Sequence, residues 1–461
     1  MDKNVLWSLR LGFSGRQAAA IKKLGAERFL EQSFKLKPGS SLPHFLEDEP
    51  KTIEEIKAKR QLMHKDRQLG REMRQEDSKI FFALKAWWIA KMEEDEYPLR
   101  EKMALFWHNH FVATRDKVKN NYWLYEYNRL FRENAFGNFK DITEKVLRSN
   151  AMVVYLDNTK NTPKGFNENL SRELLELFTL GEGNYTEQDI KEGAKGLAGL
   201  TPADNGAVYV TRNEFNGTFE YFGEKGAFKS DEMVDIIFRQ PNAPYHITRK
   251  LLQWFIYDNP PEALVKKYGD YLRKENYEIK PFLKKLVTEE FNKPTEGSKI
   301  KDPLTYMLHL LDELNIKGQN HKLTALFIRQ QGMDLFNQPN VKGWKGGSYW
   351  LTAQLYVQRN RVADMFCNGR NFSRNMLRSV GDKDDEHTEG FAVKINWQHS
   401  GTNKDVINAL QQRVLTYADG SLQPNFEEML VYDFKPQSPG ADNAVMRLFN
   451  YMVKTPEFQI I

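Results

Sequence analysis

The chain has 461 residues, of which 40% are hydrophobic and 28% charged, a balance that is typical of a globular protein. Its single cysteine, Cys367, excludes an internal disulfide framework and any zinc site that needs several cysteines. The net charge of +5 is too small to indicate nucleic-acid binding, and no run of about 18 uncharged apolar residues is available to span a membrane.

The first third of the chain has the periodicity of helices. We expect two short helices within 16–33, separated at Gly25, and a long, highly charged helical pattern over 51–92 that ends in the apolar stretch FFALKAWWIA. A further helix is predicted after Pro98, which suits a first helical turn. Two more are expected at about 120–135 and 139–149.

Capping residues delimit the next two helices. Asn167 is a suitable N-cap and Gly181 a suitable terminator for the first of them. Thr186 and Asp189 have the spacing of a capping box at the start of the second, which we expect at 187–198.

Between about 207 and 222 the pattern changes to that of strands. AVYVTRNEF and TFEYFG flank Asn216-Gly217, the strongest short hairpin signal, so we expect a small β-hairpin projecting from a helical body. Helices then resume at about 230–239, 244–257, 261–274, 279–291, 303–315 and 321–336.

The C-terminal part alternates helices with loops. The loop FNQPNVKGWKGG precedes a helix from Ser348, and residues 368–402 are rich in loop signals with one candidate strand at FAVKINW. Two or three helices complete the chain. Because we find no repeat, low-complexity tract or long linker, the sequence predicts a mainly α-helical fold: a single domain over residues 1–461, with the small hairpin and loop-rich insertions.

The sequence WHNHF, Trp107 to Phe111, is the first candidate for chemistry. If the helix that follows Pro98 continues through it, His108 and His110 lie about 200° apart around the axis and cannot bind one metal together. If the chain is extended there, the two imidazoles share one face, as many metal sites require. The alternative is a packed helix end whose histidines bind backbone or carboxylate groups.

NENLSRELLELFTLG, from Asn167 to Gly181, is the second candidate. On a regular helix, one polar stripe forms opposite a wide leucine-rich face: Asn169, Arg172, Glu173 and Glu176. This stripe is either a solvated face, with an Arg172–Glu176 ion pair, or a polar site. In a site, two carboxylates one turn apart can share a proton or a metal, and an adjacent arginine keeps one of them ionised.

NVKGWKGGSYWLT, from Asn340 to Thr352, is the third candidate. Its glycines allow backbone conformations that other residues resist, and they place Trp344 beside the helix that carries Trp350. The segment is either an aromatic wall of a ligand groove or a buried turn anchored by Trp344.

Other features carry less chemistry. His246, in PYHITRKLLQWF, is expected in the first turn of a helix rather than in a ligand set. The basic stretch 57–74 also contains Asp66 and Glu72, so we expect a solvated helix face there. The sequence contains no P-loop, no GxGxxG after a strand, no GxSxG and no HExxH, and Cys367 has no adjacent histidine to activate it.

At the three candidate stretches the sequence resembles the bacterial family labelled domain of unknown function 1800. The resemblance covers nearly the whole chain, in order: RLGFS (Arg10 to Ser14), KMALFWHNHFV, AMVVYLDN, NENLSRELLELFTLGEGNYTEQDIKEGAKGLAGLT, NVKGWKGGSYWLT and YMVKTPEFQ. It implies one complete domain. It also implies that the polar residues of the first two candidates matter together: Trp107 to Phe111, Asn167, Glu168, Asn169, Arg172, Glu173 and Glu176.

The resemblance implies no reaction, because the family has none assigned to it. Many members of the family are exported. The first residues here, MDKNVLWSLRLGFSG, lack the apolar segment of a secretory signal, so the sequence as it stands predicts a cytoplasmic protein, or an exported one if a leader is missing.

The leading hypothesis is an enzyme, a hydrolase or lyase acting on a polar polymer such as a carbohydrate. Its catalytic groups would be Glu173, Glu176, His108, His110 and Arg172. Its substrate-binding groups would be Asn109, Asn167, Asn169, Trp344 and Trp350. The alternatives are a metal- or haem-binding protein that uses the same histidines and carboxylates, and a non-catalytic binding or scaffold protein with a buried polar network. The cofactor stays unassigned, and the expected ligand is a polymer or a small molecule.

Overall fold

The chain folds almost entirely into helices, as its periodicity predicts. The computed structural model describes residues 1–39, 41–316, 318, 321–370, 392–416, 420–430 and 434–461, and α-helices hold most of them. Within this described part, strands are confined to two sheets of two short strands each. The fold class is therefore mainly α.

The first third of the chain supplies nine α-helices. They are α1 (Lys3–Leu11), α2 (Ala18–Leu24), α3 (Ala26–Lys35), α4 (Ile53–Lys65), α5 (Arg67–Glu94), α6 (Leu99–His110), α7 (Asn121–Glu133), α8 (Phe139–Leu147) and α9 (Asn150–Tyr155). The long pattern predicted over 51–92 is divided between α4 and α5 because Asp66 interrupts it. The carboxylate of Asp66 accepts hydrogen bonds from the backbone N–H groups of Gln68 and Leu69 and so caps α5.

Helices also dominate the remainder. A short α10 (Asn169–Glu173) runs into a π-helix (Leu174–Thr179), and the later α-helices are α11 (Glu187–Leu197), α12 (Ser230–Arg239), α13 (Ala243–Phe255), α14 (Glu262–Lys274), α15 (Ile279–Glu290), α16 (Pro303–Glu313), α17 (His321–Gln330), α18 (Ala353–Cys367), α20 (Asn403–Val414), α21 (Gln423–Glu428) and α22 (Ala441–Val453). The capping box predicted at Thr186 and Asp189 is present. Two predicted helix starts are wrong: Glu168, not Asn167, is the N-cap of α10, and α18 begins at Ala353 after a 3₁₀ turn (Gly347–Trp350).

The strands lie elsewhere than the sequence predicts. β3 (Phe219–Tyr221) pairs antiparallel with β4 (Glu224–Gly226), so the hairpin turns at Phe222-Gly223 and not at Asn216-Gly217. Both turn residues have positive φ, 48° and 81°, which gives the twist that two-residue hairpins favour. β2 (Val208–Tyr209) pairs instead with β1 (Leu200–Thr201). Of the candidate strand FAVKINW, residues 392–397 form no strand, and the first residue lies outside the described part.

One hydrophobic core connects most of the described helices, and α6 runs through it. Every residue of α6 except Asn109 is buried. The helix accommodates charge because Glu101 accepts hydrogen bonds from Arg132 at 2.8 Å and from the indole of Trp88 at 2.9 Å. α3, α5 and α7 pack against it.

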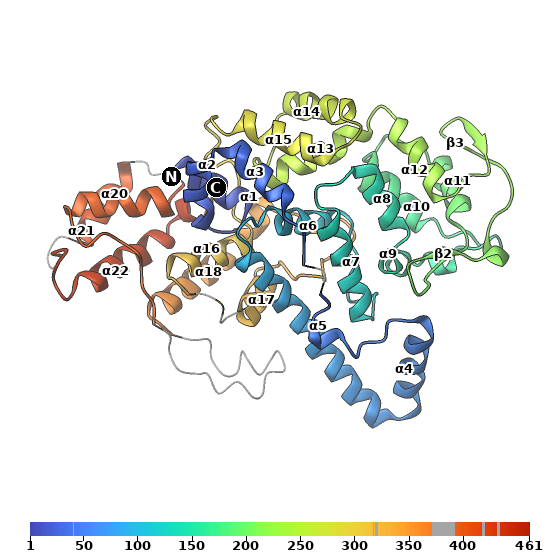
Figure 1. Ribbon diagram of the computed structural model, residues 1–461, viewed down its shortest axis with the longest axis horizontal. Helices are drawn as coiled ribbons and strands as arrows, with labels where there is room; N and C mark the ends of the chain where they lie inside the picture. The colour runs from blue at the N-terminus through green and yellow to red at the C-terminus, as the bar shows by residue number, and fades with distance from the viewer. Residues whose placement is uncertain (40, 317, 319–320, 371–391, 417–419, 431–433) are drawn as a thin grey trace.

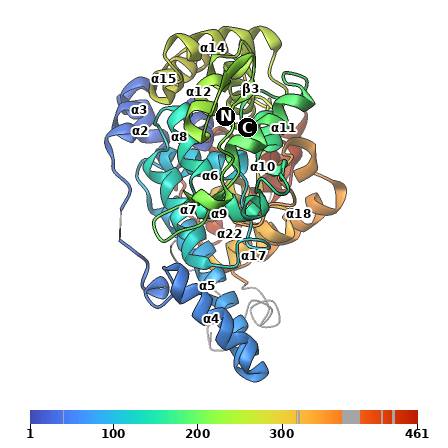
Figure 2. The same ribbon diagram turned by 90° about the vertical axis from the view of Figure 1, so that its right-hand side faces the viewer.

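The remaining helices are grouped around α6 (Figure 1). α13, α14 and α15 lie together, α10 to α12 form one end of the molecule, and α20 to α22 form the other. The two termini lie side by side, and the backbones of Ile461 and Lys299 exchange hydrogen bonds of 2.7 and 3.0 Å. α4 and the first half of α5 extend away from the body in both views (Figures 1 and 2). None of the described helices is both long and apolar enough to cross a bilayer.

Candidate functional site

WHNHF closes helix α6, and regular helical geometry separates its two histidines as predicted. His108 is completely buried, and its Nε2 lies 3.3 Å from the side-chain amide of Asn128. Its ring is enclosed by aromatic side chains, among them Trp88, Phe131 and Phe336. Burial lowers the pKa of His108 to about 3, so its imidazole is neutral. With no exposed surface, His108 is a core residue.

His110 instead faces the end of the π-helix. Its Nε2 lies 3.0 Å from the carbonyl oxygen of Phe178, and its Nδ1 lies 3.3 Å from Lys250 Nζ. Since a carbonyl only accepts, Nε2 carries the proton and Nδ1 accepts from the lysine. Burial, together with the nearby Lys250 and His246, lowers the pKa of His110 well below its usual range. This ring is therefore neutral as well.

The second candidate motif contributes through its backbone. The last carbonyl groups of a helix have no partner within it. At the end of this π-helix, the oxygen of Leu177 lies 2.9 Å from His246 Nε2 and 3.0 Å from Lys250 Nζ. Together with the bond from His110 to Phe178, these contacts orient three side chains at one helix end. His246 lies in the first turn of α13, as the sequence predicts.

The carboxylates of the motif do not join the histidines. Neither Glu173 nor Glu176 forms a hydrogen bond or ion pair with an imidazole among the described residues. Glu176 accepts a hydrogen bond from the hydroxyl of Tyr185 at 2.8 Å and lies 3.8 Å from Lys342 Nζ. Burial, reinforced by the charge of Glu176, raises the pKa of Glu173.

Arg172 has partners other than the one predicted. Its guanidinium binds Glu187 of α11 at 2.9 and 3.0 Å and Glu168 at 3.2 Å, rather than Glu176. Because this network is partly exposed, it stabilises the fold only slightly, and it joins the start of α10 to α11.

The two asparagines of the motif shape its beginning. Asn167 accepts a hydrogen bond from the backbone N–H of Asn169 at 3.0 Å and donates to the carbonyl of Asp157 at 3.3 Å. Asn169 itself is exposed. Of the predicted polar stripe, Asn169 is therefore exposed, while Arg172, Glu173 and Glu176 are partly buried.

The third candidate, NVKGWKGG, closes over the end of α6. The side-chain oxygen of Asn109 accepts a hydrogen bond from the backbone N–H of Trp344 at 2.7 Å. Gly343 has a φ of 80°, and a Cβ at this position would lie 2.4 Å from Asn109 Oδ1, so the close approach requires glycine. Trp344 and Trp350 are each 5% exposed, so only a small part of each side chain is open to the cavity that they line.

These elements enclose a cavity of about 950 Å³. Asn109 and His110 of α6, Lys250 and Trp254 of α13 and most of the loop 340–350 line it, and the rest of its wall is formed by Phe106, Gln253, Asp258, Asn259, Lys299 and Ile300. A space of this size accommodates a small molecule or a few units of a polymer. A cavity of about 740 Å³ beside α7 contains none of the predicted site residues. The structure thus brings the first and third candidates together.

The cavity is rich in lysine. Among the described residues, Lys250, Lys299, Lys342 and Lys345 line it, against a single carboxylate, Asp258. Burial lowers the pKa of Lys250 to about 8.

The surroundings of the Lys250 amine are uncharged. Among the described residues no carboxylate forms an ion pair with it. The amine donates to His110 Nδ1 and to the carbonyl of Leu177. Its third position therefore holds a proton when the amine is charged and a lone pair when it is neutral.

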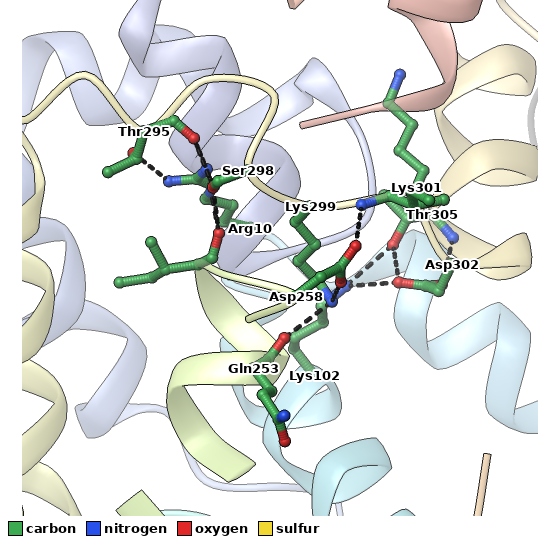
Figure 3. A network of polar contacts seen from close by, with 12 residues as sticks. Arg10, Lys102, Gln253, Asp258, Thr295, Ser298, Lys299, Lys301, Asp302 and Thr305 are labelled. Atoms are coloured by element: carbon green, nitrogen blue, oxygen red, sulfur yellow. Dashed lines mark hydrogen bonds and ion pairs between the residues drawn. The ribbon is translucent and has the colours of Figure 1, made fainter. Parts of the chain in front are cut away.

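A polar network lies behind the Lys299 side of the cavity (Figure 3). Lys299 donates to the carbonyl of Gln253 at 2.9 Å and lies 3.7 Å from Asp258. Buried Lys102 lies 3.4 Å from Asp302. Four basic residues are labelled here, Arg10, Lys102, Lys299 and Lys301, against two carboxylates, Asp258 and Asp302, so the network behind the cavity is rich in basic residues.

Arg10, from the opening sequence RLGFS, holds the loop that leads to Lys299. Its guanidinium donates to the hydroxyl and the carbonyl of Thr295, both at 2.6 Å, and to Ser298 at 3.1 Å. This residue is almost completely buried. Its role is to position the cavity wall.

The histidines and carboxylates suggested as metal ligands do not form a cluster. The described part of the chain contains no group of three or more His, Cys, Asp or Glu side chains arranged to hold a metal ion. His108, in particular, lies within the aromatic core.

The sequence analysis did not single out several cavity residues, among them Lys250, Asp258 and Lys299. Lys250 follows His246 by four residues, a spacing that places both on one face of α13. This i, i+4 spacing was the one sequence signal that could have identified Lys250. Asp258 and Lys299 lie in loops and belong to no recognisable motif.

The fold and the cavity together define a mainly α-helical protein whose lysine- and tryptophan-lined cavity is closed by a glycine-rich loop. The family described as "Protein of unknown function (DUF1800)" matches residues 5–460, and the chain belongs to this family. No curated protein and no solved structure matches it.

Proposed function

We propose that the chain is an enzyme that cleaves an acidic, sugar-containing polymer by elimination, as a lyase. The observation that carries the proposal is the amine of Lys250, which lines the cavity and, in the described residues, has only neutral partners. Titratable groups with shifted pKa values in polar and aromatic cavities are typical of functional sites.

The lining of the cavity favours an anionic substrate. Four lysines against one carboxylate give it an excess of positive charge, and the lysines with the best access to a ligand are those on the loop, Lys342 and Lys345. Trp254, Trp344 and Trp350 add apolar surface of the kind that packs against sugar rings. A polymer of uronic acid units combines both properties.

Elimination needs one group that can both remove and return a proton. Neutral Lys250 takes the proton from the carbon next to the substrate carboxylate, and the electron pair left behind forms a carbon–carbon double bond. The bond from the neighbouring carbon to the linking oxygen breaks, and Lys250 returns the proton to that oxygen. Lys299 and Lys342 stabilise the negative charge that grows on the substrate carboxylate. His110 holds the amine through Nδ1.

Hydrolysis by a carboxylate pair has less support. Glycosidases generally use two carboxyl groups that flank the bond. In this cavity only Asp258 is available, and it already accepts a hydrogen bond from the backbone N–H of Ile300 at 3.0 Å and faces Lys299. Glu173 and Glu176 stay candidates for a second proton-transfer group, because Lys342 joins Glu176 to the cavity wall.

The proposal is tested by incubating the purified chain with uronic acid polymers and with neutral polysaccharides. We expect the ultraviolet absorbance of an unsaturated product from acidic polymers alone. Lys250→Met should lower this rate roughly 100-fold or more, as loss of a general base does. Lys404→Met, at an exposed position of α20, is the matched control and should leave the rate unchanged.

The other outcomes contradict the proposal in different ways. New reducing ends without ultraviolet absorbance would identify a hydrolase. Full activity of Lys250→Met would remove Lys250 from the reaction. Tight binding of an acidic polymer without cleavage would identify a binding protein.

A further inference from the structure

α4 and the first turns of α5 form an arm, residues 53–74, that projects from the body of the molecule (Figures 1 and 2). The opposite half of α5 is embedded in the core, where Trp88 and Ile89 are completely buried. α5 is one uninterrupted helix of 28 residues. It is therefore roughly 42 Å long. The arm is a continuation of a helix that the core holds in place.

The two helices of the arm contact each other closely but bury few of their residues. A Cβ on Gly70 would lie 2.3 Å from the carbonyl oxygen of Met63, so α5 touches the α4 backbone at this point. Lys59 joins α4 to the base of the arm through Asp77 and Glu49, at 2.6 and 2.8 Å. Within the arm only Ile56 and Gly70 are buried. Nearly all of its side chains are thus available to a partner.

The net positive charge of the chain is concentrated on this arm. Residues 53–74 contain seven Lys and Arg against four Asp and Glu, a net charge of +3 in a chain whose total is +5. Asp66 is engaged as the cap of α5, and Glu72 accepts a hydrogen bond from Gln68 at 3.2 Å. Six cations of the arm form no ion pair within the described part of the chain: Lys57, Arg60, Lys65, Arg67, Arg71 and Arg74.

Two leucines are exposed among these cations. Leu62, at the end of α4, is 50% exposed, and Leu69, in the first turn of α5, is 39% exposed. Exposed leucines surrounded by arginine and lysine have the composition of a surface that enters the headgroup region of an anionic bilayer. A soluble polyanion would bind the cations of the arm but would not require exposed leucines beside them. A projecting tip also reaches a flat surface without hindrance from the body.

We propose that the arm docks the protein on a bilayer containing anionic lipid. Leu62 and Leu69 enter the interface, and the six cations lie against the lipid charges. In the free protein this stretch is a solvated helix face, as the sequence predicts. On the bilayer, its exposed leucines contact lipid. This inference does not depend on the reaction in the cavity.

The test is co-sedimentation of the full chain with vesicles of phosphatidylcholine alone or mixed with phosphatidylglycerol. We expect binding to the mixed vesicles only, weakening as salt is raised. Combining Arg60→Glu, Arg67→Glu and Arg71→Glu should abolish binding, and Leu62→Ser with Leu69→Ser should weaken it at least tenfold. The matched control combines Lys191→Glu, Lys225→Glu and Lys404→Glu, three exposed positions outside the arm, and should bind as the parent does.

The arm is mostly exposed, so circular dichroism should show that every variant is folded. The proposal is wrong if the parent does not bind the mixed vesicles, or if the matched control loses as much binding as the arm variant. It is also wrong if the serine variant binds vesicles as the parent does. In that case, binding of heparin or DNA through the same arginines would identify a soluble polyanion as the partner.

Discussion

Among the described residues, no carboxylate forms an ion pair with the charged amine of Lys250. Its neighbours are a neutral imidazole and a helix-end carbonyl, and the partial negative charge of the helix end compensates burial only in part. A protein selected for stability alone would place an apolar side chain there. Functional sites commonly retain such costly groups.

The free energy of unfolding of Lys250→Met tests this explanation. The pKa of Lys250 is lowered by burial from 10.5 to about 8, so between these values the unfolded chain binds a proton that the folded chain releases. Stability therefore rises with pH across this window, and below about pH 8 the folded protein bears the full penalty, about 3 kcal/mol. We expect Lys250→Met to be more stable than the parent at pH 7, by at most this amount.

Urea unfolding over a series of pH values measures the difference. The advantage of the variant should shrink as the pH approaches 10.5, the ordinary pKa of lysine. Lys404→Met, which replaces an exposed lysine, should show no such dependence. A variant less stable than the parent at every pH would mean that the hydrogen bonds of Lys250 outweigh its burial.

The loop that carries Trp344 depends on two glycines in different ways. Gly343 and Gly346 both have positive φ, 80° and 72°, so alanine strains the backbone at either position. Only at Gly343 would the new Cβ meet the backbone and side chain of Asn109, at 2.5 and 2.4 Å; at Gly346 the nearest atom is 3.8 Å away. Gly346 is therefore a matched control for the steric term.

We expect Gly346→Ala to lower the free energy of unfolding by about 1 kcal/mol, the cost of a left-handed alanine. Gly343→Ala should cost about 2–4 kcal/mol, because the loop must also move away from α6. Urea unfolding gives both values. Equal losses would show that the bond between Asn109 and the Trp344 backbone does not hold the loop against α6.

Glu173 and Glu176 lie on either side of a change from α-helix to π-helix. On a regular helix Glu173 and Glu176 share a stripe with Arg172, but here α10 ends at Glu173 and the chain continues as a π-helix. π-turns are rare and occur often at functional sites. The last carbonyl groups of this one contact His110, His246 and Lys250, which no side-chain pattern reveals.

Across the whole molecule, buried histidines predict sensitivity to acid. Burial lowers the pKa of four of them: His108, His110, His246 and His309. Below about pH 6.5 the unfolded chain protonates these rings while the folded chain keeps them neutral, so stability falls as the pH falls. Together they contribute a slope of up to about 5 kcal/mol per pH unit.

Unfolding measurements between about pH 7 and pH 5 check this expectation. His108→Gln should reduce the slope by about 1.4 kcal/mol per pH unit, because one proton fewer is bound on unfolding. His64→Gln, at an exposed position of the arm, should leave the slope unchanged. A protein equally stable at both ends of this range would contradict the neutral state of the buried rings.

Signals from residues that are neighbours in the sequence suffice to predict much of the secondary structure of this protein. Periodicity and capping residues predict the helical class, and the sequence singled out four cavity residues: Asn109, His110, Trp344 and Trp350. These predictions succeed because helix formation and glycine conformation are decided within a few residues. The same local reasoning fails at the hairpin, which turns at Phe222-Gly223 and not at Asn216-Gly217.

The chemistry of the cavity is decided at longer range. Lys250 meets His110 across 140 residues and Leu177 across 73. The fold also gives the two histidines of one motif different surroundings, because α6 directs His108 into the aromatic core and His110 toward the cavity. A pKa depends on every charge and every apolar atom packed around a group. For this reason the sequence alone identified the helices and the loop, and only the packed structure shows Lys250 lining the cavity beside His110 and the Leu177 carbonyl.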